Sequence, residues 1–382
     1  MLTYRGKYNS ANVMIDEVES TLVQQIYSFL NHPAFEHGYI AIMPDCHAGA
    51  GSCIGFTKQM NEYVIPNVVG VDIGCGIDGY NLGKLILDKR DLGALDDYIR
   101  NNIPSGFKVR KEMIADIIKE NFDLLVVVEV ICDEIGLDYS KVLKSIGTLG
   151  GGNHFIELNK DPDKNIWLTI HSGSRNFGLQ VAQYHQKKAK ELMRKMFIGD
   201  AFKGLEFLPL DEGGKKYLED MKVAQKYAEL NRQEIAIQLI DEFFGGAEAV
   251  DVVKTTHNYI NFKDNIIRKG AISAHKDERL LIPLNMKDGV IVGKGKGNKK
   301  WNCSAPHGAG RVLSRKKAKE KIKLSDVEHQ MEMAGVFTKS VNKNTLDEAP
   351  GAYKDSQLII DSLEESVEIE FVMKPIYNFK AS

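Results

Sequence analysis

The chain has 382 residues, of which 43% are hydrophobic and 27% charged, with a formal net charge of −2 at pH 7. This composition is that of an ordinary globular protein with a substantial core. It excludes a generally basic surface of the kind that coats nucleic acid, so any site for nucleic acid must be a local basic patch.

The cysteines and the hydrophobic segments indicate a reducing, cytoplasmic location. The five cysteines are odd in number and spread through a long chain, which argues against a disulfide framework. The first residues, MLTYRGKYNS, lack the apolar segment of a signal peptide. The longest apolar run, Leu124 to Cys132, is too short to cross a bilayer and contains Glu129, so we expect no membrane association.

The first half of the chain combines apolar runs with glycine turns and a helical segment. The runs at 38–43 and 64–69 predict buried strands that end in polar loops. Residues 89–145 predict helices, and strands are expected next at 155–158 and 166–170.

The second half opens with a helical block at 180–245, where apolar residues recur at helical spacing and Gly245-Gly246 ends the pattern. We expect this apolar stripe to pack in the core. The elements predicted after it are strands at 252–292, a loop at the glycine-dense 293–300, helices at 316–335 and a terminal strand at 366–380. The pattern predicts an α+β fold, and motifs near both ends that serve one site indicate a single domain over 1–382.

Asp72 and Cys75 lie three residues apart in the tight turn Val71-Asp-Ile-Gly-Cys-Gly76, directly after an apolar run. A carboxylate and a thiolate that converge in such a turn suit a divalent metal. An inert buried cysteine beside a turn-stabilising aspartate explains the same residues, and this motif alone favours neither interpretation.

His154 and Glu157 follow a glycine-rich turn, Gly147-Thr-Leu-Gly-Gly-Gly152, that enters a predicted strand. Three residues is an odd separation, so in a strand the two side chains point to opposite faces unless a bend lies between them. We therefore expect them to have different roles. The glycines allow close approach of the backbone to a ligand.

Two further histidines complete a candidate metal set. His171 ends a predicted strand in Ile170-His-Ser-Gly-Ser-Arg175, and His257 lies in a Thr-His-Asn-Tyr segment. With Asp72, Cys75 and His154 they would give more ligands than one tetrahedral site needs, which suits two metals that share a bridging thiolate. Ligand type makes zinc the first choice and leaves manganese open.

His307 stands in Ala305-Pro-His-Gly-Ala-Gly-Arg311, just after the lysine- and glycine-rich segment 293–300. A neutral imidazole nitrogen can attack phosphorus and form a phosphoramidate, and Arg311 would neutralise phosphate charge. The alternative is another metal ligand or a capping histidine. Segment 293–300 does not fit a Walker A motif; a solvated turn and a contact to RNA or phosphate are equally consistent with it.

Together these segments resemble one family, the RtcB-type RNA-splicing ligases. The matching segments occur in the family's order and cover most of the chain: MPDCHAGAGSCIGF (43–56), GVDIGCG (70–76), GTLGGGNHFIE (147–157), IHSGSR (170–175), HNY (257–259), HGAGRVLSR (307–315) and AYKD (352–355). The resemblance implies a single RtcB-like domain with mixed β-sheets flanked by helices around a central metal and nucleotide cleft.

The resemblance also implies roles for residues. Cys75 would bridge two manganese ions, with Asp72 and His154 completing one site and His171 and His257 the other. His307 would be the histidine that becomes guanylylated. Further matches are nucleotide contacts at Asn153, Glu157, Tyr353 and Lys380, RNA phosphate contacts at Arg175 and Arg311, and residues near the reaction centre at Asp45 and His47.

The implied activity is a GTP- and manganese-dependent ligation of RNA. A 2′,3′-cyclic phosphate or 3′-phosphate end would be joined to a 5′-hydroxyl end through a histidine–GMP intermediate, in tRNA splicing or in a paralogous branch that repairs RNA. An activating protein is a further expected partner. The alternatives are a metal enzyme that only hydrolyses cyclic phosphates or caps 3′-phosphates, and a non-catalytic RNA-binding protein.

The sequence departs from the family pattern at Leu284-Asn-Met-Lys-Asp-Gly-Val290, where many members carry a serine-bearing turn. Because that turn lies near the guanine nucleotide in the family, the change bears on nucleotide affinity and on the preference for GTP. His275 also stands where another residue, such as arginine, is expected.

Overall fold

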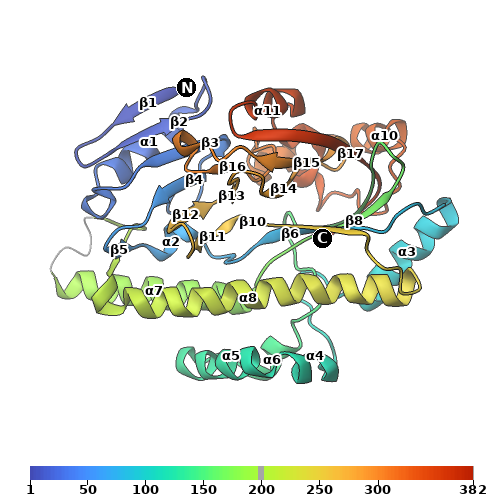
Figure 1. The fold of residues 1–382 in the computed structure, drawn as a ribbon, viewed down its shortest axis with the longest axis horizontal. Helices are drawn as coiled ribbons and strands as arrows, with labels where there is room; N and C mark the ends of the chain where they lie inside the picture. The colour runs from blue at the N-terminus through green and yellow to red at the C-terminus, as the bar shows by residue number, and fades with distance from the viewer. Residues whose placement is uncertain (197–201, 382) are drawn as a thin grey trace.

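Two large β-sheets carry most strands of the computed structural model, which describes residues 1–196 and 202–381 (Figure 1). The larger sheet has seven strands, and each neighbouring pair in it is antiparallel. In spatial order its strands are β10 (Asp251–Thr256), β6 (Gly76–Asn81), β8 (Ile166–Ser172), β7 (Phe155–Lys160), β17 (Val367–Lys380), β15 (Gly289–Gly295) and β14 (Arg279–Asn285).

The second sheet has six strands and is mixed, because β2 and β3 run parallel while its other pairs are antiparallel. In spatial order it contains β1 (Leu2–Arg5), β2 (Ser10–Val13), β3 (Ile40–His47), β4 (Ile54–Gln59), β12 (Ile266–Lys269) and β11 (Asn258–Asn261). Two short ribbons pair β13 (Ala271–Ser273) with β16 (Ser304–Pro306), and β5 (Tyr63–Val64) with β9 (Leu208–Pro209).

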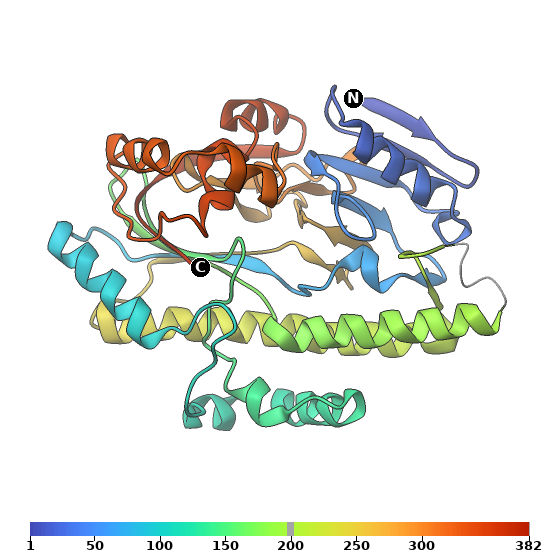
Figure 2. The same ribbon diagram turned by 180° about the vertical axis from the view of Figure 1, so that it is seen from behind.

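Helices α7 (Arg175–Lys195) and α8 (Lys215–Gln238) lie side by side along one face of the sheets, and α5 (Phe122–Ile135) packs on their other side (Figures 1 and 2). The remaining helices are α1 (Ser20–Leu30), α2 (Pro66–Val69), α3 (Lys89–Asn102), α4 (Ala115–Glu120), α6 (Tyr139–Leu143), α9 (Arg315–Lys321), α10 (Leu324–Met333) and α11 (Ser356–Ser362). The fold is therefore α+β, as the sequence predicts.

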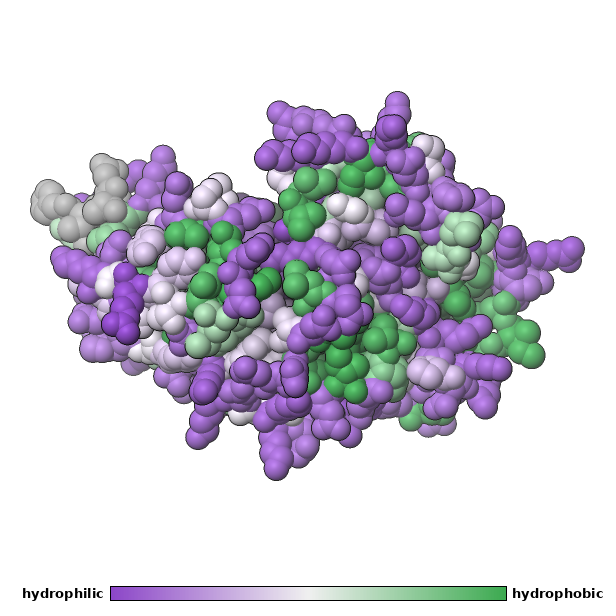
Figure 3. All heavy atoms as spheres, turned by 90° about the horizontal axis from the view of Figure 1, so that it is seen from above, coloured by the Kyte–Doolittle hydropathy of each residue, from purple (hydrophilic) through white to green (hydrophobic). Residues whose placement is uncertain are grey.

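The surface seen from above is mostly hydrophilic, with apolar side chains in scattered patches (Figure 3). In the described residues, every helix is too short or too polar to cross a lipid bilayer. The predicted apolar stripe is largely in the core: Ala224, Ala228 and Ile235 of α8 and Leu239 just after it are fully buried, whereas Phe243 is half-buried.

The antiparallel pairing in the larger sheet brings the ends of several strands together on one side of the sheet, which we call the edge. Strand β8 pairs with both β6 and β7, so Ile77 and Phe155 lie opposite His171 near its end. Phe155 also lies opposite Lys380 at the end of β17, and Gly76 lies opposite Thr256 at the end of β10. The residues just outside β6, β7 and β10 are Cys75, His154 and His257. Hence four segments far apart in the sequence deliver polar side chains to one edge.

Arg232 of α8 fixes the start of β6 from below the sheet. Its Nε donates to Asp78 Oδ1 at 2.8 Å, and its Nη1 donates to the carbonyls of Gly74 at 2.9 Å and Ser172 at 3.1 Å. Both charged side chains are buried. The guanidinium therefore ties the turn before β6 to the end of β8.

Asn231, the preceding residue, holds the neighbouring turns. Its Oδ1 accepts from the backbone N–H of Thr148 at 3.0 Å, and its Nδ2 donates to Ser172 Oγ and to the Gly173 carbonyl, both at 3.0 Å. Because a buried polar group needs partners, the pair Asn231-Arg232 satisfies its own hydrogen-bonding needs only when these turns are in place.

Three sequence expectations need correction. The run 64–69 is not a strand: β5 ends at Val64, and Pro66 begins the short helix α2, where the missing N–H of proline costs no hydrogen bond. The block 180–245 is not one helical unit, since α7 ends at Lys195 and β9 intervenes before α8.

The third correction concerns 293–300, which is a loop only in part. Gly293 and Gly295 belong to β15 and pair with β17. A Cβ at Gly293 would lie 2.7 Å from the Glu368 carbonyl oxygen, and one at Gly295 would lie 2.3 Å from the Ala274 carbonyl carbon. The glycines therefore allow close packing of backbones, whereas the sequence suggested turn flexibility.

The buried Arg232–Asp78 pair gives a prediction for stability. Arg232→Met leaves the Asp78 carboxylate buried without its partner, which costs about 3–5 kcal/mol. We expect a marked fall in the urea midpoint of unfolding, largely restored in the double variant Arg232→Met/Asp78→Leu. A single variant as stable as the unmodified chain would contradict the role of this pair.

Candidate metal centre and nucleotide cleft

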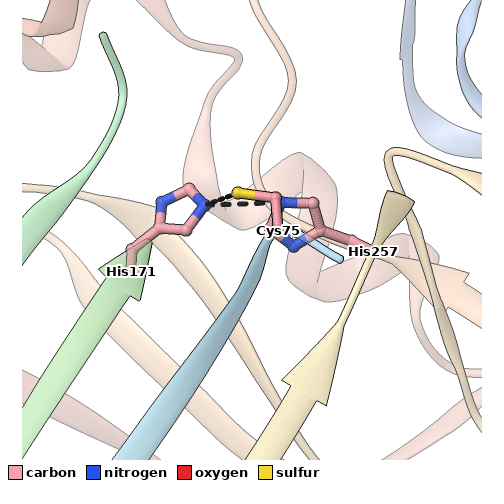
Figure 4. A group of neighbouring side chains, drawn as sticks. All are labelled: Cys75, His171 and His257. Carbon is pink, nitrogen blue, oxygen red and sulfur yellow. Dashed lines mark hydrogen bonds between the residues drawn. The ribbon is translucent and has the colours of Figure 1, made fainter. Parts of the chain in front are cut away.

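Cys75 is at the centre of a buried cluster of potential metal ligands. Its Sγ lies 3.2 Å from His171 Nε2 and 3.4 Å from His154 Nε2. His171 Nε2 lies 3.3 Å from His257 Nε2. The side chains of Cys75, His171 and His257 come from the ends of adjacent strands (Figure 4). All four residues are at least 96% buried.

The ligand atoms form two groups that share the Cys75 sulfur. One group is Cys75, His171 and His257, and the other is Asp72, Cys75 and His154, with all atoms of each group within 4.8 Å of one another. Asp72 Oδ2 lies 3.1 Å from His154 Nε2. This arrangement can hold two cations with a bridging thiolate.

Backbone carbonyls orient two of the imidazoles. His154 Nδ1 lies 2.8 Å from the Leu149 carbonyl, and His171 Nδ1 lies 3.2 Å from the Asn153 carbonyl. A ring whose Nδ1–H donates to a carbonyl keeps the lone pair on Nε2, which is the nitrogen that faces Cys75. The glycine turn 147–153 thus presents both histidines as ligands.

The protonation of the cluster fits a bound cation. Burial raises the pKa of the Cys75 thiol well above its usual range, and burial lowers the pKa of His171 and His257 well below theirs. Burial alone would raise the pKa of Asp72, but the hydrogen bond and charge of His154 lower it to about 2. The neutral imidazoles of His171 and His257 and the carboxylate of Asp72 are ready ligands, and a cation would supply the charge that favours a buried thiolate.

His307 lies beside this cluster and is held by Asp45. Its Nδ1 is 2.6 Å from Asp45 Oδ2, and its backbone N–H donates to the same oxygen at 3.2 Å. The Asp45 carboxylate is completely buried. When Nδ1–H donates to this carboxylate, the lone pair of His307 is on Nε2, and its ring centre lies 4.9 Å from that of His257.

Two lysine side chains, the half-buried Lys354 and the buried Lys269, hold the segment around Asp45. Lys354 Nζ donates to the carbonyls of Pro44 at 2.7 Å and Cys46 at 3.2 Å. Lys269 Nζ donates to the Ser52 carbonyl at 3.1 Å and also contacts the Ala50 carbonyl. These contacts fix the end of β3, which carries Asp45 and His47, and the loop that follows it.

A cleft of about 300 Å³ opens over the cluster. Of the residues expected to bind metal, nucleotide or phosphate, it is lined by Asp72, Cys75, His171, His257, His307, Asn153, Glu157, Tyr353, Lys380, Arg311 and His47. The other three expected residues do not line the cleft but contact residues or turns beside it. His154 contacts Asp72 and Cys75, and Asp45 contacts His307. Arg175 lies next to Gly150 of the glycine turn.

Arg175 holds that turn from its buried side. Its Nε donates to Thr148 Oγ1 at 3.0 Å and its Nη2 to the Gly106 carbonyl at 2.8 Å. A Cβ at Gly150 would lie 2.0 Å from Arg175 Nη1 and 2.7 Å from His154 Nδ1, so only glycine fits there.

Glu157 lines the cleft from β7, on the same face of the strand as Phe155. Its Oε2 accepts from Asn378 Nδ2 at 2.6 Å. Burial raises the pKa of Glu157 to about 7, although the Asn378 hydrogen bond and the charge of Lys380 act in the opposite direction. Lys380 Nζ lies 4.8 Å from the ring centre of Phe155.

Tyr353, Glu348 and Arg311 form a second set of linked polar side chains in the cleft wall. The Tyr353 hydroxyl donates to Glu348 Oε2, and Arg311 Nη1 lies 3.2 Å from Glu348 Oε1. The Arg311 guanidinium also lies 5.1 Å from the Tyr353 ring centre. Sequence analysis missed Glu348, although this acid lies only four residues before the AYKD segment.

The segment that departs from the family pattern also lines the cleft. Leu284, Asn285, Met286 and Gly289 contribute to its wall. The Asn285 side chain is committed to its own turn, since its Oδ1 accepts from the backbone N–H of Lys287 and Asp288 and its Nδ2 donates to Asp288 Oδ2. His275 pairs with Asp264 at 2.8 Å and does not line the cleft.

Comparison with known proteins gives one consistent result. The sequence profile described as tRNA-splicing ligase RtcB matches residues 25–132 and 136–381. The RNA-splicing ligases RtcB1 and RtcB of two Escherichia coli strains are 31% and 30% identical to the chain, over 94% of the chain and 94% of each relative. The tRNA-splicing ligase RtcB of Methanococcus maripaludis is 27% identical over 93% of the chain and 91% of its own length.

The shared sulfur predicts a spectroscopic signature. Co²⁺ added to the metal-free protein should give a thiolate-to-cobalt charge-transfer band in the near ultraviolet, because Cys75 would be a ligand of the bound ion. Titration should reach two ions per chain if both groups fill.

Cys75→Ala should abolish this band, whereas Cys303→Ala, which removes a cysteine outside the cluster, should leave it intact. Retention of the band in Cys75→Ala would contradict the assignment of the sulfur as a ligand.

Proposed function

Because the chain belongs to the tRNA-splicing ligase RtcB family, we propose that it is an RNA ligase that uses GTP and two Mn²⁺ ions and carries GMP covalently on His307. Its substrates would be RNA ends with a 2′,3′-cyclic phosphate or 3′-phosphate and RNA ends with a 5′-hydroxyl, in tRNA splicing or in RNA repair.

The observation that carries this proposal is the Asp45–His307 pair at the edge of the Cys75 cluster. A nucleophilic imidazole needs a free lone pair in a fixed direction, and a buried carboxylate on Nδ1 provides both. A metal enzyme that only hydrolyses cyclic phosphates would need no such histidine, since metal-bound water suffices. The pair therefore favours nucleotidyl transfer.

The metal ions would be held by Asp72, Cys75 and His154 on one side and by Cys75, His171 and His257 on the other. When bound, such ions neutralise phosphate charge and polarise the phosphorus that is attacked. The donor set fits this role, because its single thiolate and carboxylate leave net positive charge for anionic ligands.

The proposed reaction proceeds by successive displacements at phosphorus. His307 Nε2 attacks the α-phosphorus of GTP, so that an N–P bond forms and pyrophosphate leaves. Water opens a cyclic phosphate to a 3′-phosphate, one oxygen of which attacks the His307-bound phosphorus and releases the imidazole. The 5′-hydroxyl then attacks the activated 3′-phosphate, loses its proton, and GMP leaves. Asp45 would stabilise the His307 ring in each protonation state.

Guanine recognition is proposed for Glu157 in the wall of the cleft. The N1–H and N2–H groups of guanine both donate, and an ionised carboxylate can accept both. Adenine lacks this pair of donors on the equivalent edge. Tyr353, Lys380 and Asn153 would complete the nucleotide contacts, and Arg311 and Arg175 those to RNA phosphates. These assignments are supported by the grouping of these residues in and beside one cleft.

The test of the ligase mechanism is incubation with α-labelled GTP and Mn²⁺, followed by denaturing electrophoresis. An acid-labile label should appear on the protein and be absent from His307→Ala. Asp45→Asn should slow labelling by about 100-fold or more, because the imidazole loses its orienting carboxylate.

The Asp45→Asn protein should still give the cobalt–thiolate band, which separates loss of ring orientation from loss of metal. An unlabelled wild-type protein, or a His307→Ala protein that labels normally, would overturn the proposed mechanism.

The raised pKa of Glu157 predicts a pH dependence of nucleotide binding. In a His307→Ala background, which forms no covalent complex, GTP affinity should increase as pH rises through about 7, because the ionised carboxylate is the better acceptor. Glu157→Gln should weaken GTP binding by about 5- to 150-fold, equivalent to about 1–3 kcal/mol, and should remove this increase.

Calorimetry at several pH values measures both effects, with ATP as the matched control ligand. Equal affinities for ATP and GTP, or an unchanged pH profile in Glu157→Gln, would show that Glu157 does not read the base.

A further inference from the structure

Phe107 is an exposed aromatic residue that packs against nothing. Its relative exposure is 104%, although it lies in the segment between α3 and α4 and not at a chain end. Single exposed apolar residues are common on protein surfaces, so Phe107 is informative only through its position next to the cleft. The backbone beside Phe107 is anchored through Gly106 and Ser105.

The segment that carries Phe107 is anchored to the glycine turn of the cleft. Gly106 N–H donates to the Gly150 carbonyl at 2.8 Å, and Ser105 forms a β-bridge with Gly150. A Cβ at Gly151 would lie 3.6 Å from Gly106 Cα, so the two backbones are in contact. In Figure 2 this segment passes in front of the long helices α7 and α8. Phe107 is therefore one residue from a backbone contact with the turn that carries Asn153 and His154.

Helix α9 begins beside the same glycine turn. Its first residue, Arg315, lines the cleft, and a Cβ at Gly152 would lie 3.4 Å from the Arg315 guanidinium. The helix reads Arg-Lys-Lys-Ala-Lys-Glu-Lys from 315 to 321. Five of its seven residues are therefore basic in a chain whose net charge is −2.

Part of this positive charge has no internal partner. Arg315 and Lys319 reach the carboxylate of Asp347 at 3.1 and 3.3 Å. Within the described ranges, 1–196 and 202–381, no carboxylate lies within 4.0 Å of Lys316, Lys317 or Lys321, and all three are exposed. Exposed lysines without acidic partners attract an anionic ligand.

We propose that these features form a binding surface for single-stranded RNA next to the cleft. The surface, which we term the rim, consists of Phe107, the glycine turn Gly150–Gly152, and Lys316, Lys317 and Lys321 of α9. An unpaired base stacks on Phe107, and the lysines contact successive phosphates. The inference rests on the proposed function, since it specifies how the RNA strand approaches the reacting centre.

Single-stranded RNA fits the rim better than other partners. Stacking on an exposed aromatic ring requires a base that is not paired in a duplex, and the three exposed lysines of α9 match the charge of a phosphate backbone. Glycines between the ring and the lysines let a strand pass close to the protein backbone. A protein partner would instead be expected to bury a larger apolar patch than one phenylalanine.

The test is binding of a fluorescently labelled oligouridylate with a 3′-phosphate to the Mn²⁺-loaded protein without GTP. Phe107→Ala should weaken binding by about 5- to 100-fold. Lys316→Ala/Lys317→Ala/Lys321→Ala should lower the slope of log affinity against log salt concentration by about 2, since each phosphate contact to a single strand contributes about 0.7. The same oligouridylate annealed to a complementary strand should be insensitive to Phe107→Ala.

Matched control variants remove the same groups elsewhere. Phe122→Ala removes an exposed phenylalanine on α5, and Lys187→Ala/Lys188→Ala/Lys190→Ala removes three exposed lysines from α7. Both controls should bind the oligouridylate like the unmodified protein. If the rim variants bind it normally, or if the controls lose as much affinity as the rim variants, the rim is not the RNA surface.

Labelling with α-labelled GTP separates this inference from the proposed function. The rim variants should label at the wild-type rate, because no rim side chain contacts His307, Asp45 or the cysteine cluster. Absence of labelling in the wild-type protein would remove the ligase mechanism whatever the rim does. Normal labelling with unchanged RNA binding in the variants would remove only the rim.

Discussion

The buried contacts of Asn231 and Arg232 are the constraint on which the site depends. These adjacent residues of α8 bind the turn before Cys75, the end of the strand that carries His171, and the glycine turn that precedes His154. The larger sheet brings these segments to one edge, but its hydrogen bonds end where the turns begin. The side chains of Asn231 and Arg232 hold the turns by further hydrogen bonds. This requires burial of the Arg232 guanidinium, whose charge is compensated by Asp78 and two carbonyls.

The need of buried polar groups for partners also shapes the chemistry of the site. A thiol, a carboxylate and three imidazoles converge within hydrogen-bonding distances around Cys75, and their ligand atoms have each other as neighbours. A divalent cation resolves this arrangement, because it takes lone pairs that have no protein donor. Asp45 does for His307 what carbonyls do for His154 and His171: it fixes one ring nitrogen so that the other is available. One imidazole set would thus bind metal, while the remaining imidazole is left to react with phosphorus.

Much of this site could be predicted from the sequence, because ligand types in glycine turns at strand ends carry a local signal. Strands at 155–158, 166–170 and 366–380 are confirmed, as is the α+β class. Residues whose role depends on packing were missed: Asn231 and Arg232 sit inside a helix whose pattern indicated only core, and Phe107 has no motif. The prediction of a strand at 64–69 was wrong, because an apolar run does not distinguish a strand from a short helix that begins at proline. The glycines at 293 and 295 suggested a loop, since sequence does not reveal which backbone lies opposite.

The central claim is that one imidazole nitrogen, oriented by Asp45 and adjacent to the cysteine cluster, carries the nucleotide. Peptide mapping by mass spectrometry under alkaline conditions tests it most directly, after incubation of the protein with GTP and Mn²⁺. The account predicts the mass of one guanylyl group on the peptide that contains His307, and on no other histidine-containing peptide. A guanylyl group on a lysine, on His47 or on any ligand histidine would contradict the account, because the geometry that makes His307 the nucleophile would then have no role in the reaction.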